Sequence, residues 1–337
     1  MPSNPCIKLA AKATGLPGLQ NFRYDVDEQP VPKDGEALIR VDWISIDPYL
    51  ITRIKSRENY APGVDVGDVM EADAIGQVIQ SNWSERAVGD MVMGSFGMQS
   101  FALDGPDAES QAIAPLVGET PKLALTLINP GLTAYFGLLD IGRPTAGETV
   151  LVSAGAGSVG SIVAAIAKIK KCRAVAVVGS DDKINYCIET LGYAAAVNRK
   201  DPAFPKKLKE ACPGGVDVFF DNTGGPIYDE AIKVMNIAGR IIACGRIAGA
   251  QFSDPAQDIG PRDTDAFIVK RLAKKGFLVS DYEDQETEAI ADLLQWHKEG
   301  AISVREDILE GVENAPAAFM RLISGENVGK QLVRVKH

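Results

Sequence analysis

A glycine-rich segment near the middle of the chain constrains the fold most strongly. Residues 151–160 read Leu-Val-Ser-Ala-Gly-Ala-Gly-Ser-Val-Gly, so that Gly155, Gly157 and Gly160 form a G-x-G-x-x-G pattern. In a strand–turn–helix unit, the first glycine permits a tight turn and the second lets backbone N–H groups approach a pyrophosphate. The third lets the helix pack closely on the strand. We therefore predict a dinucleotide site formed by these glycines with Ser158 and Val159; a glycine-rich turn without a ligand is the alternative.

The sequence around this segment predicts the unit that such a site needs. From about residue 126, short apolar runs alternate with helical patterns. The predicted strands are 149–153, 174–178, 216–220 and 239–244, and the predicted helices are 160–171, 182–191, 228–235 and 286–298. This alternation is typical of a parallel sheet with helices on both faces, the doubly wound α/β class. The run 149–167 carries no charge, but its six central residues are glycine, alanine and serine, which favours a strand, turn and helix over a membrane span.

The first 125 residues have a different character. Segments 37–46, 72–80 and 89–94 are predicted strands, in part with period-two alternation, and helical periodicity is scarce. We interpret this part as a compact, barrel-like β domain. A further strand, 330–335, ends the chain, and its pattern alone does not assign it to the parallel sheet.

The end of the second predicted strand indicates which dinucleotide binds. Sites for NADH place an Asp or Glu there, but this chain has Gly179, followed by Ser180 and Lys183. The missing carboxylate and the nearby lysine favour the 2′-phosphate of NADPH, although a solvated lysine is the alternative. Asp181 and Asp182 argue against NADPH unless they belong to the first turn of the next helix, where acids suit the helix dipole.

Three further positions lie where ligands bind in doubly wound sheets. Arg199 and Lys200 follow the next strand and either add positive charge at the phosphate or are solvated surface residues. Asp221-Asn222-Thr223-Gly224-Gly225 and Cys244-Gly245 each end a strand, which makes them ligand loops or ordinary loops.

Composition excludes several classes of function. The formal net charge is −10, which argues against nucleic acid and anionic lipid as partners. The five cysteines are scattered without any CxxC pair, as expected of small buried reduced thiols in a cytoplasmic protein, and no targeting peptide is visible. The two histidines, His297 and His337, cannot supply a His-rich metal site. We therefore expect no metal.

These motifs together resemble a known family. Ser45-Ile46-Asp47-Pro48-Tyr49 followed by Arg53, the segment 129–138, Gly179-Ser180-Asp181-Asp182-Lys183 and Gly325-Glu326-Asn327-Val328-Gly329-Lys330 carry the match. They are similar to the zinc-independent medium-chain dehydrogenase/reductases, in the branch of leukotriene B4 12-hydroxydehydrogenase, prostaglandin reductase, plant 2-alkenal reductase and bacterial curcumin reductase. The resemblance spans nearly the whole chain.

The resemblance implies a domain organisation and a set of site residues. It implies a GroES-like substrate and catalytic domain, residues 1–125 with 310–337, into which a Rossmann NADP-binding domain, residues 126–309, is inserted. It also implies a homodimer. The residues it adds along the cofactor are Thr133, Asn222, Cys244, Phe277, Leu278, Val279 and Asn327, with Ser180, Lys183 and Arg199 at the 2′-phosphate. The residues it implies for the substrate pocket are Tyr49, Arg53 and Ile247.

Two departures from the family matter. Some members carry a tyrosine where this chain has Arg199, and an arginine there could still contact the 2′-phosphate. Many members have a tyrosine shortly after the Cys-Gly pair, whereas residues 244–251 here contain none. Any proton donor at that position is therefore in doubt, and the pocket is expected to have a different shape.

The function implied is NADPH-dependent reduction of the activated carbon–carbon double bond of an enone or enal. Tyr49 is the candidate oxygen donor or pocket residue, with a packed aromatic as the alternative, and the proton donor to carbon stays open. A zinc alcohol dehydrogenase would need Cys or His ligands, yet residues 1–170 contain only Cys6 and no histidine. A quinone oxidoreductase on the same scaffold and a non-catalytic NADPH-binding protein remain as alternatives.

Overall fold

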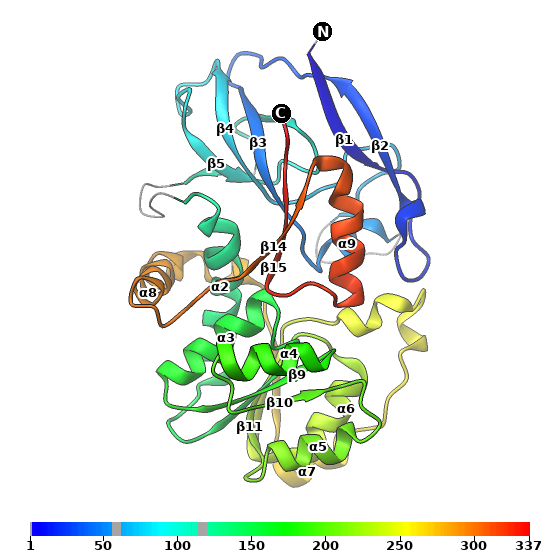
Figure 1. Ribbon diagram of the computed structural model, residues 1–337, viewed down its shortest axis with the longest axis vertical. Coiled ribbons are helices and arrows are strands. Elements are labelled where there is room, and N and C mark those ends of the chain that lie inside the picture. Colours follow the sequence, from blue (N-terminus) through cyan, green and yellow to red (C-terminus); the bar gives the residue numbers. More distant parts are fainter. Residues whose placement is uncertain (1, 56–61, 109, 114–119) are drawn as a thin grey trace. The chain divides into compact units, whose positions relative to one another are not determined.

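The computed structural model describes residues 2–55, 62–108, 110–113 and 120–337, and they form two compact units (Figure 1). The first unit combines Met1–Thr126 with Glu306–His337, and the second is Leu127–Arg305. The second unit is the α/β part of the chain, and the first is built mainly from antiparallel strands. A doubly wound parallel sheet is thus inserted into a β unit formed by both ends of the chain, as the family resemblance implies.

The second unit is organised around a parallel sheet with the strand order β10-β9-β8-β11-β12-β13. Its strands are β8 (Thr149–Ser153), β9 (Arg173–Val178), β10 (Ala195–Asn198), β11 (Val216–Asp221), β12 (Met235–Ala243) and β13 (Ala273–Gly276). The chain runs from β8 outward to β10, then returns to β11 beside β8 and continues outward to β13. The strand order therefore reverses between β8 and β11, which makes their carboxyl ends the topological switch point where ligands bind.

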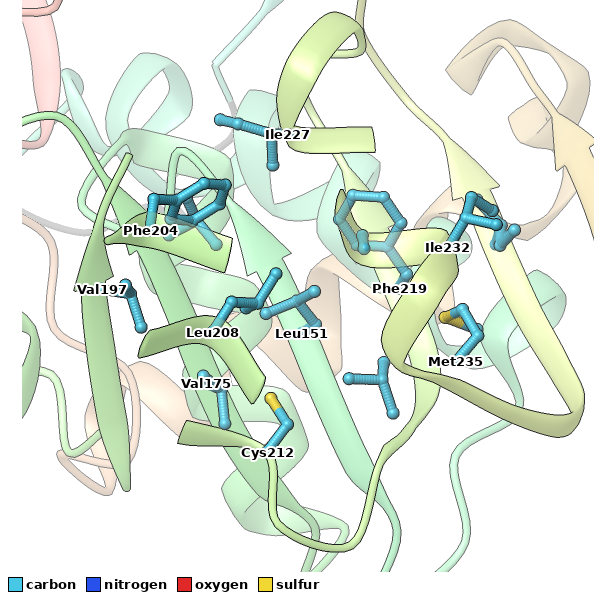
Figure 2. Close-up of a cluster of buried hydrophobic side chains, with 14 of the residues drawn as sticks. Leu151, Val175, Val197, Phe204, Leu208, Cys212, Phe219, Ile227, Ile232 and Met235 are labelled. Carbon is cyan, nitrogen blue, oxygen red and sulfur yellow. The ribbon is translucent and has the colours of Figure 1, made fainter. Parts of the chain in front are cut away.

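Continuous apolar strands explain why helices cover both faces of this sheet. Every residue of β8 is buried, and such strands need cover on each side. On one face, Leu151, Val175 and Phe219 pack with α5 (Phe204–Ala211) and α6 (Gly225–Val234) into the cluster drawn in Figure 2. The remaining helical segments of this unit are α2 (Asn129–Phe136), η4 (Gly137–Gly142), α3 (Ser158–Ile169), α4 (Asp181–Asn185), η5 (Tyr186–Thr190), η6 (Ile247–Gln251), η7 (Pro255–Gln257), α7 (Thr264–Lys270), η8 (Val279–Gln285) and α8 (Glu286–Lys298).

The opposite face of the sheet carries the alternate residues of the same strands. A Cβ added to Gly142 would lie 3.1 Å from Val218, and one added to Gly137 would lie 2.8 Å from the Phe220 ring. Val218 and Phe220 flank Phe219 in β11, so the period-two alternation of the strand sends them to the other side. The α2–η4 segment therefore covers this face at close approach.

Two apolar stretches are long enough to resemble membrane spans. The first, 149–167, forms β8, a turn and the start of α3, which confirms the sequence interpretation. The second, Ala124–Gly142, is helical and passes a test of length and hydropathy for a membrane span, but 72% of it is buried inside the protein. Its burial matches the packing of its Gly137–Gly142 part on β11.

The described residues of the first unit form two sheets. Strands β1 (Ser3–Leu9) and β2 (Phe22–Glu28) pair antiparallel. The larger sheet has the order β14-β15-β3-β4-β5-β7, with β6 also paired to β3. The strands of the larger sheet are β3 (Ala37–Ser45), β4 (Ala74–Ser81), β5 (Met91–Gly94), β6 (Phe101–Asp104), β7 (Ser110–Ala112), β14 (Glu306–Glu310) and β15 (Lys330–Arg334). The helical segments described in this unit are η1 (Leu19–Asn21), α1 (Leu50–Ile54), η9 (Val312–Asn314) and α9 (Ala315–Ser324), and η3 (Ala124–Ile128) spans the boundary with the second unit.

The last strand of the chain belongs to this β unit. Leu332 of β15 pairs antiparallel with Ser45 of β3, and β14 pairs parallel with β15. The family resemblance implies that the inserted domain ends at residue 309. In the structure, Glu306–Glu310 pairs with β15, and the first unit resumes at residue 306.

Candidate functional site

The turn between β8 and α3 has the close approaches that a G-x-G-x-x-G segment requires. A Cβ on Gly155 would lie 2.7 Å from the Ala176 Cβ of β9, and one on Gly160 would lie 2.5 Å from the Ala154 carbonyl oxygen. On Gly157 it would meet only the Ala154 oxygen, at 3.2 Å. Gly155 and Gly160 are therefore needed for packing, whereas Gly157 leaves room in front of the turn. The left-handed residue of the turn is Ala154 (φ 52°), one position before the glycine to which the sequence assigned the tight turn.

A buried tyrosine that the sequence analysis did not single out holds this turn. The Tyr193 hydroxyl lies 2.7 Å from the Gly160 carbonyl oxygen and 3.3 Å from that of Gly155. Burial raises the pKa of Tyr193 well above its ordinary value, so the phenol stays protonated as a donor. The residue lies in the loop before β10, and no local pattern connects it to a turn more than thirty positions earlier.

The amino terminus of α3 is the part of the turn that can receive an anion. Ser158, Val159 and Gly160 are its first three residues, and such N–H groups lack partners inside the helix. The Ser161 N–H is already bonded to the Gly157 carbonyl at 2.9 Å. The aligned peptide dipoles of this 12-residue helix add positive potential at the same place. Together with the room at Gly157, these donors fit the pyrophosphate of a dinucleotide.

Asp181 and Asp182, the acids that argued against NADPH, lie in the first turn of a helix, as the alternative interpretation of the sequence expected. Asp181 and Asp182 form the first turn of α4, and Ser180 precedes them as the N-cap in extended conformation. The Asn198 side-chain amide donates to Asp181 Oδ1 at 2.9 Å. Asp181 is thus used in joining α4 to the end of β10, and both acids suit the helix dipole.

Basic side chains occupy the neighbourhood of the β9 end instead. Gly179 is half-buried, and a Cβ on it would lie 4.0 Å from Arg199 Nε, so the arginine side chain passes beside the strand end. Lys183 is half-buried on α4, one turn after Ser180. Arg199 is exposed, as is Lys200. The arrangement of Gly179, Ser180, Lys183 and Arg199 fits a phosphate on the ribose.

A buried carboxylate lies at the switch point. Asp221 ends β11 and is only 3% exposed. Its Oδ1 accepts hydrogen bonds from the Ser153 hydroxyl at 2.9 Å, from the Thr223 N–H at 3.0 Å and from the Gly224 N–H at 2.9 Å. The Thr223 hydroxyl adds a longer bond of 3.3 Å. From the sequence we predict residues 221–225 as a ligand loop or an ordinary loop, without a specific role for Asp221 or Ser153.

Asn222 and Cys244 form hydrogen bonds with Ser153 and Asp221 at the switch point. The Asn222 backbone N–H donates to Ser153 Oγ, and its side-chain amide donates to the Ser153 carbonyl, both at 2.8 Å. The Cys244 and Gly245 N–H groups both donate to the Asp221 carbonyl at 3.0 Å. Burial, with a smaller contribution from the Asp221 charge, raises the pKa of the Cys244 thiol to about 12. The thiol is therefore neutral at physiological pH.

The remaining predicted residues of the second unit lie on other segments. Thr133 is half-buried on α2, and Ile247 is half-buried at the start of η6. Phe277, Leu278 and Val279 follow β13, where the Leu278 N–H donates to Asp281 Oδ2 at 3.0 Å. Phe277 packs edge-on to Tyr282 with ring centroids 6.3 Å apart.

The predicted pocket residues belong to the first unit. Tyr49 is half-buried at the N-cap of α1, with the Arg53 guanidinium 5.2 Å from its ring centroid. Arg53 is buried and its Nε lies 2.9 Å from Glu71 Oε2. Burial raises the pKa of Tyr49 well above its ordinary value, and the charges of Asp73, Asp47 and Glu71 act in the same direction. The phenol is therefore protonated throughout the physiological range.

Asn327 also belongs to the first unit. It is buried, and its side-chain amide donates to the Gly329 carbonyl at 2.9 Å. Nearby in the chain, Lys330 forms an ion pair with Asp47 at 2.5 Å. This ion pair ties β15 to the segment just before Tyr49.

No group of three or more His, Cys, Asp or Glu side chains suited to a metal ion occurs within the described ranges of the chain. His297, on α8, has its Nδ1 2.9 Å from the Ile302 carbonyl oxygen. The five cysteines are free thiols; Cys6, Cys187 and Cys212 are buried, and Cys172 and Cys244 are half-buried.

Comparison with known proteins gives two family matches. Residues 6–111 match the N-terminal domain of oxidoreductase, and residues 158–296 match a family described as zinc-binding dehydrogenase. The second match starts at the first residue of α3 and ends within α8.

Whole-chain relatives are similar over nearly their full length. The NADPH-dependent curcumin reductase of Escherichia coli is 36% identical, covering 97% of this chain and 95% of the relative. Prostaglandin reductase 1 of Bos taurus is 38% identical, covering 95% of each. The crystal structure of CurA from Vibrio vulnificus in complex with NADPH superposes with a TM-score of 0.92 at 35% identity over 99% of both chains. The quinone oxidoreductase of Escherichia coli, at 20% identity and a TM-score of 0.77, shares the fold alone.

Proposed function

Because this chain belongs to the medium-chain dehydrogenase/reductase family, in the branch of curcumin reductase and prostaglandin reductase 1, we propose that it reduces enones and enals with NADPH. The bond reduced is the activated carbon–carbon double bond of an α,β-unsaturated ketone or aldehyde. The observation that carries the proposal is whole-length similarity to two reductases, combined with a dinucleotide turn that has room for a pyrophosphate at Gly157.

NADPH bound at this turn would supply a hydride to the β-carbon of the substrate. The electron pair of the double bond then moves toward the carbonyl oxygen to give an enolate, and a proton added to the α-carbon gives the saturated product. The protein holds the cofactor through the N–H groups of Ser158, Val159 and Gly160 at the pyrophosphate. Ser180, Lys183 and Arg199 hold the 2′-phosphate, because Gly179 puts no carboxylate at the strand end itself and the Arg199 side chain passes beside it.

The other proposed cofactor contacts are Thr133, Asn222, Cys244, the segment 277–279 and Asn327, the last toward the nicotinamide. The proposed substrate-pocket residues are Tyr49, Arg53 and Ile247. We propose the first unit as the substrate domain and the second as the cofactor domain.

Tyr49 is the proposed donor to the carbonyl oxygen. Its raised pKa keeps the hydroxyl protonated, and a hydrogen bond to a developing oxyanion stabilises the enolate more than the ground state. Arg53 contributes indirectly, because its guanidinium rests against the Tyr49 ring while it is held by Glu71.

Quinone reduction and NADPH binding without turnover are the alternatives. Similarity to quinone oxidoreductases is low in sequence, which favours the enone reductase. A panel of enals, enones and quinones, assayed by loss of NADPH absorbance, separates the three. Turnover with enals or enones supports the proposal, turnover with quinones alone supports the first alternative, and binding without turnover supports the second.

We propose further that the protein is a cytoplasmic homodimer that works without metal or nucleic acid. Support for the dimer comes from β13, the outermost strand of the parallel sheet, whose four residues are exposed. Such an edge invites pairing with a second copy. Exposed apolar side chains in the same unit, Ile259, Ile268 and Val269, add surface that association could bury. Sedimentation equilibrium tests the dimer, and a monomer at micromolar concentration contradicts it.

A further inference from the structure

The switch point contains a charged group that the proposed chemistry does not use. Asp221 is a buried carboxylate at the end of β11. Its side chain accepts hydrogen bonds from Ser153 of β8 and from Thr223 and Gly224 in the loop into α6, and its backbone carbonyl accepts one from Cys244 at the end of β12. We propose that Asp221 is a positioning residue for the cofactor, fixing these strand ends so that Asn222 and the glycine turn face the dinucleotide. This inference rests on the proposed function.

The hydrogen bonds of the carboxylate fix the loop that follows it. Donors from Ser153, Thr223 and Gly224 all reach the single oxygen Oδ1 within 2.9–3.0 Å. A carboxylate removed from water is stable only when several donors compensate for the lost hydration. Such charge-assisted bonds are stronger and more directional than neutral ones. The loop 222–224 is therefore held in one conformation by a charge.

The Asp221 carboxylate also connects this loop to the glycine turn, through Ser153. Ser153 Oγ donates to Asp221 and accepts the Asn222 N–H, while the Asn222 amide donates to the Ser153 carbonyl. Ser153 directly precedes Ala154, the left-handed residue that starts the turn. A shift of Asp221 is thus passed through Ser153 to both Asn222 and the turn.

The third connection runs to the end of β12. The Asp221 carbonyl accepts the Cys244 and Gly245 N–H groups, and a Cβ on Gly245 would lie 2.5 Å from the Asn222 carbonyl oxygen. The Ala248 N–H donates to the Thr223 carbonyl at 3.0 Å. The segment that leads to Ile247 is therefore packed directly on the loop that Asp221 organises.

The position of Asp221 predicts which part of the cofactor depends on it. The 2′-phosphate residues follow β9 and β10, whereas Asp221 acts between β8 and β11, beside the turn for the pyrophosphate. The pyrophosphate is common to NADPH and NADH. Loss of the charge should therefore weaken both coenzymes by the same factor, unlike loss of Lys183, which should weaken NADPH alone.

The test measures coenzyme dissociation constants of the folded full-length protein by fluorescence titration. Asp221→Asn keeps the shape and removes the charge, and we expect the Kd of NADPH and that of NADH to rise about tenfold each. Ser153→Ala removes the bridging hydroxyl with little change of volume and should act in the same direction on both coenzymes. If Asp221→Asn does not fold, Ser153→Ala decides the question.

A matched control separates positioning from stability. Asp104, in the first unit, is a buried carboxylate that accepts hydrogen bonds from Arg86 at 2.8 Å and from Ser110 at 2.5 Å. Asp104→Asn should lower the melting temperature and leave both Kd values unchanged. Unchanged binding in Asp221→Asn, or weakened binding of NADPH alone, overturns the inference and leaves the proposed function intact. A wild-type protein that binds neither coenzyme overturns both.

Discussion

Two alanine substitutions in the glycine turn separate binding from folding. Gly157 has φ −80° and ψ 176°, a conformation open to alanine, and its added methyl would meet only the Ala154 oxygen at 3.2 Å. At Gly160, the methyl would lie 2.5 Å from that oxygen and 2.8 Å from the Gly155 Cα, both backbone atoms that cannot move aside. Gly157→Ala should therefore bind poorly but fold, and Gly160→Ala should fold poorly.

The magnitudes follow from these contacts. Backbone N–H groups reach a phosphate oxygen at roughly 2.9 Å, whereas a methyl carbon needs about 3.5 Å, so the new group displaces the pyrophosphate. Loss of one hydrogen bond to a charged group weakens binding by roughly ten- to hundredfold. Overpacking at Gly160 costs about 1–3 kcal/mol, which lowers the melting temperature by roughly 2–12 °C.

Fluorescence titration with NADPH and thermal unfolding measure the two effects on the same samples. Gly157→Ala should keep its melting temperature within a few degrees of wild type, since alanine at an allowed φ/ψ changes the free energy of unfolding by about 1 kcal/mol or less. Wild-type affinity in Gly157→Ala would refute the assignment of the open side of the turn to a pyrophosphate. Equal loss of stability in both variants would refute the distinction between the two glycines.

Three other outcomes are expected. Lys183→Ala should raise the KM for NADPH about fivefold or more and barely alter that for NADH, and an equal effect on both would contradict phosphate recognition. Tyr193→Phe leaves the Gly160 carbonyl without its buried donor and should cost about 1–3 kcal/mol of unfolding free energy, measured by urea titration; an unchanged midpoint would contradict its role in the turn. Burial raises the pKa of the half-buried Cys244 thiol to about 12, so its alkylation, followed by mass spectrometry of the folded protein, should accelerate steadily as pH rises from 8 to 10. A rate that is half-maximal near pH 9 and levels off toward pH 10, as for a solvated thiol, would contradict this.

Local sequence patterns predict some elements of the second unit to the residue. The predicted strand 149–153 and helix 286–298 coincide with β8 and α8, because a buried apolar run and an amphipathic period are signals within the segment itself. The strand β13, Ala-Lys-Lys-Gly, carries no such signal, and it is a strand only because β12 offers an unpaired edge.

The candidate site likewise contains residues that local sequence predicts and residues that only the fold reveals. Gly155, Gly157 and Gly160 can be predicted from the sequence because all three glycines of the motif fall within six consecutive residues. Asp221 and Tyr193 act across sequence separations of 68 and 33 residues, so their roles depend on which strands become neighbours. A polar residue that ends an otherwise apolar strand, as Ser153 and Asp221 do, is the signal that could have identified the pair.

The fate of the transferred hydride tests the proposed reaction most directly. The enzyme is incubated with NADPH carrying deuterium at the transferable position and with an enone, and the product is analysed by NMR. We expect a saturated ketone with deuterium on the former β-carbon and the carbonyl intact. Deuterium on the carbonyl carbon of an allylic alcohol, or no turnover of any enone or enal, would contradict it.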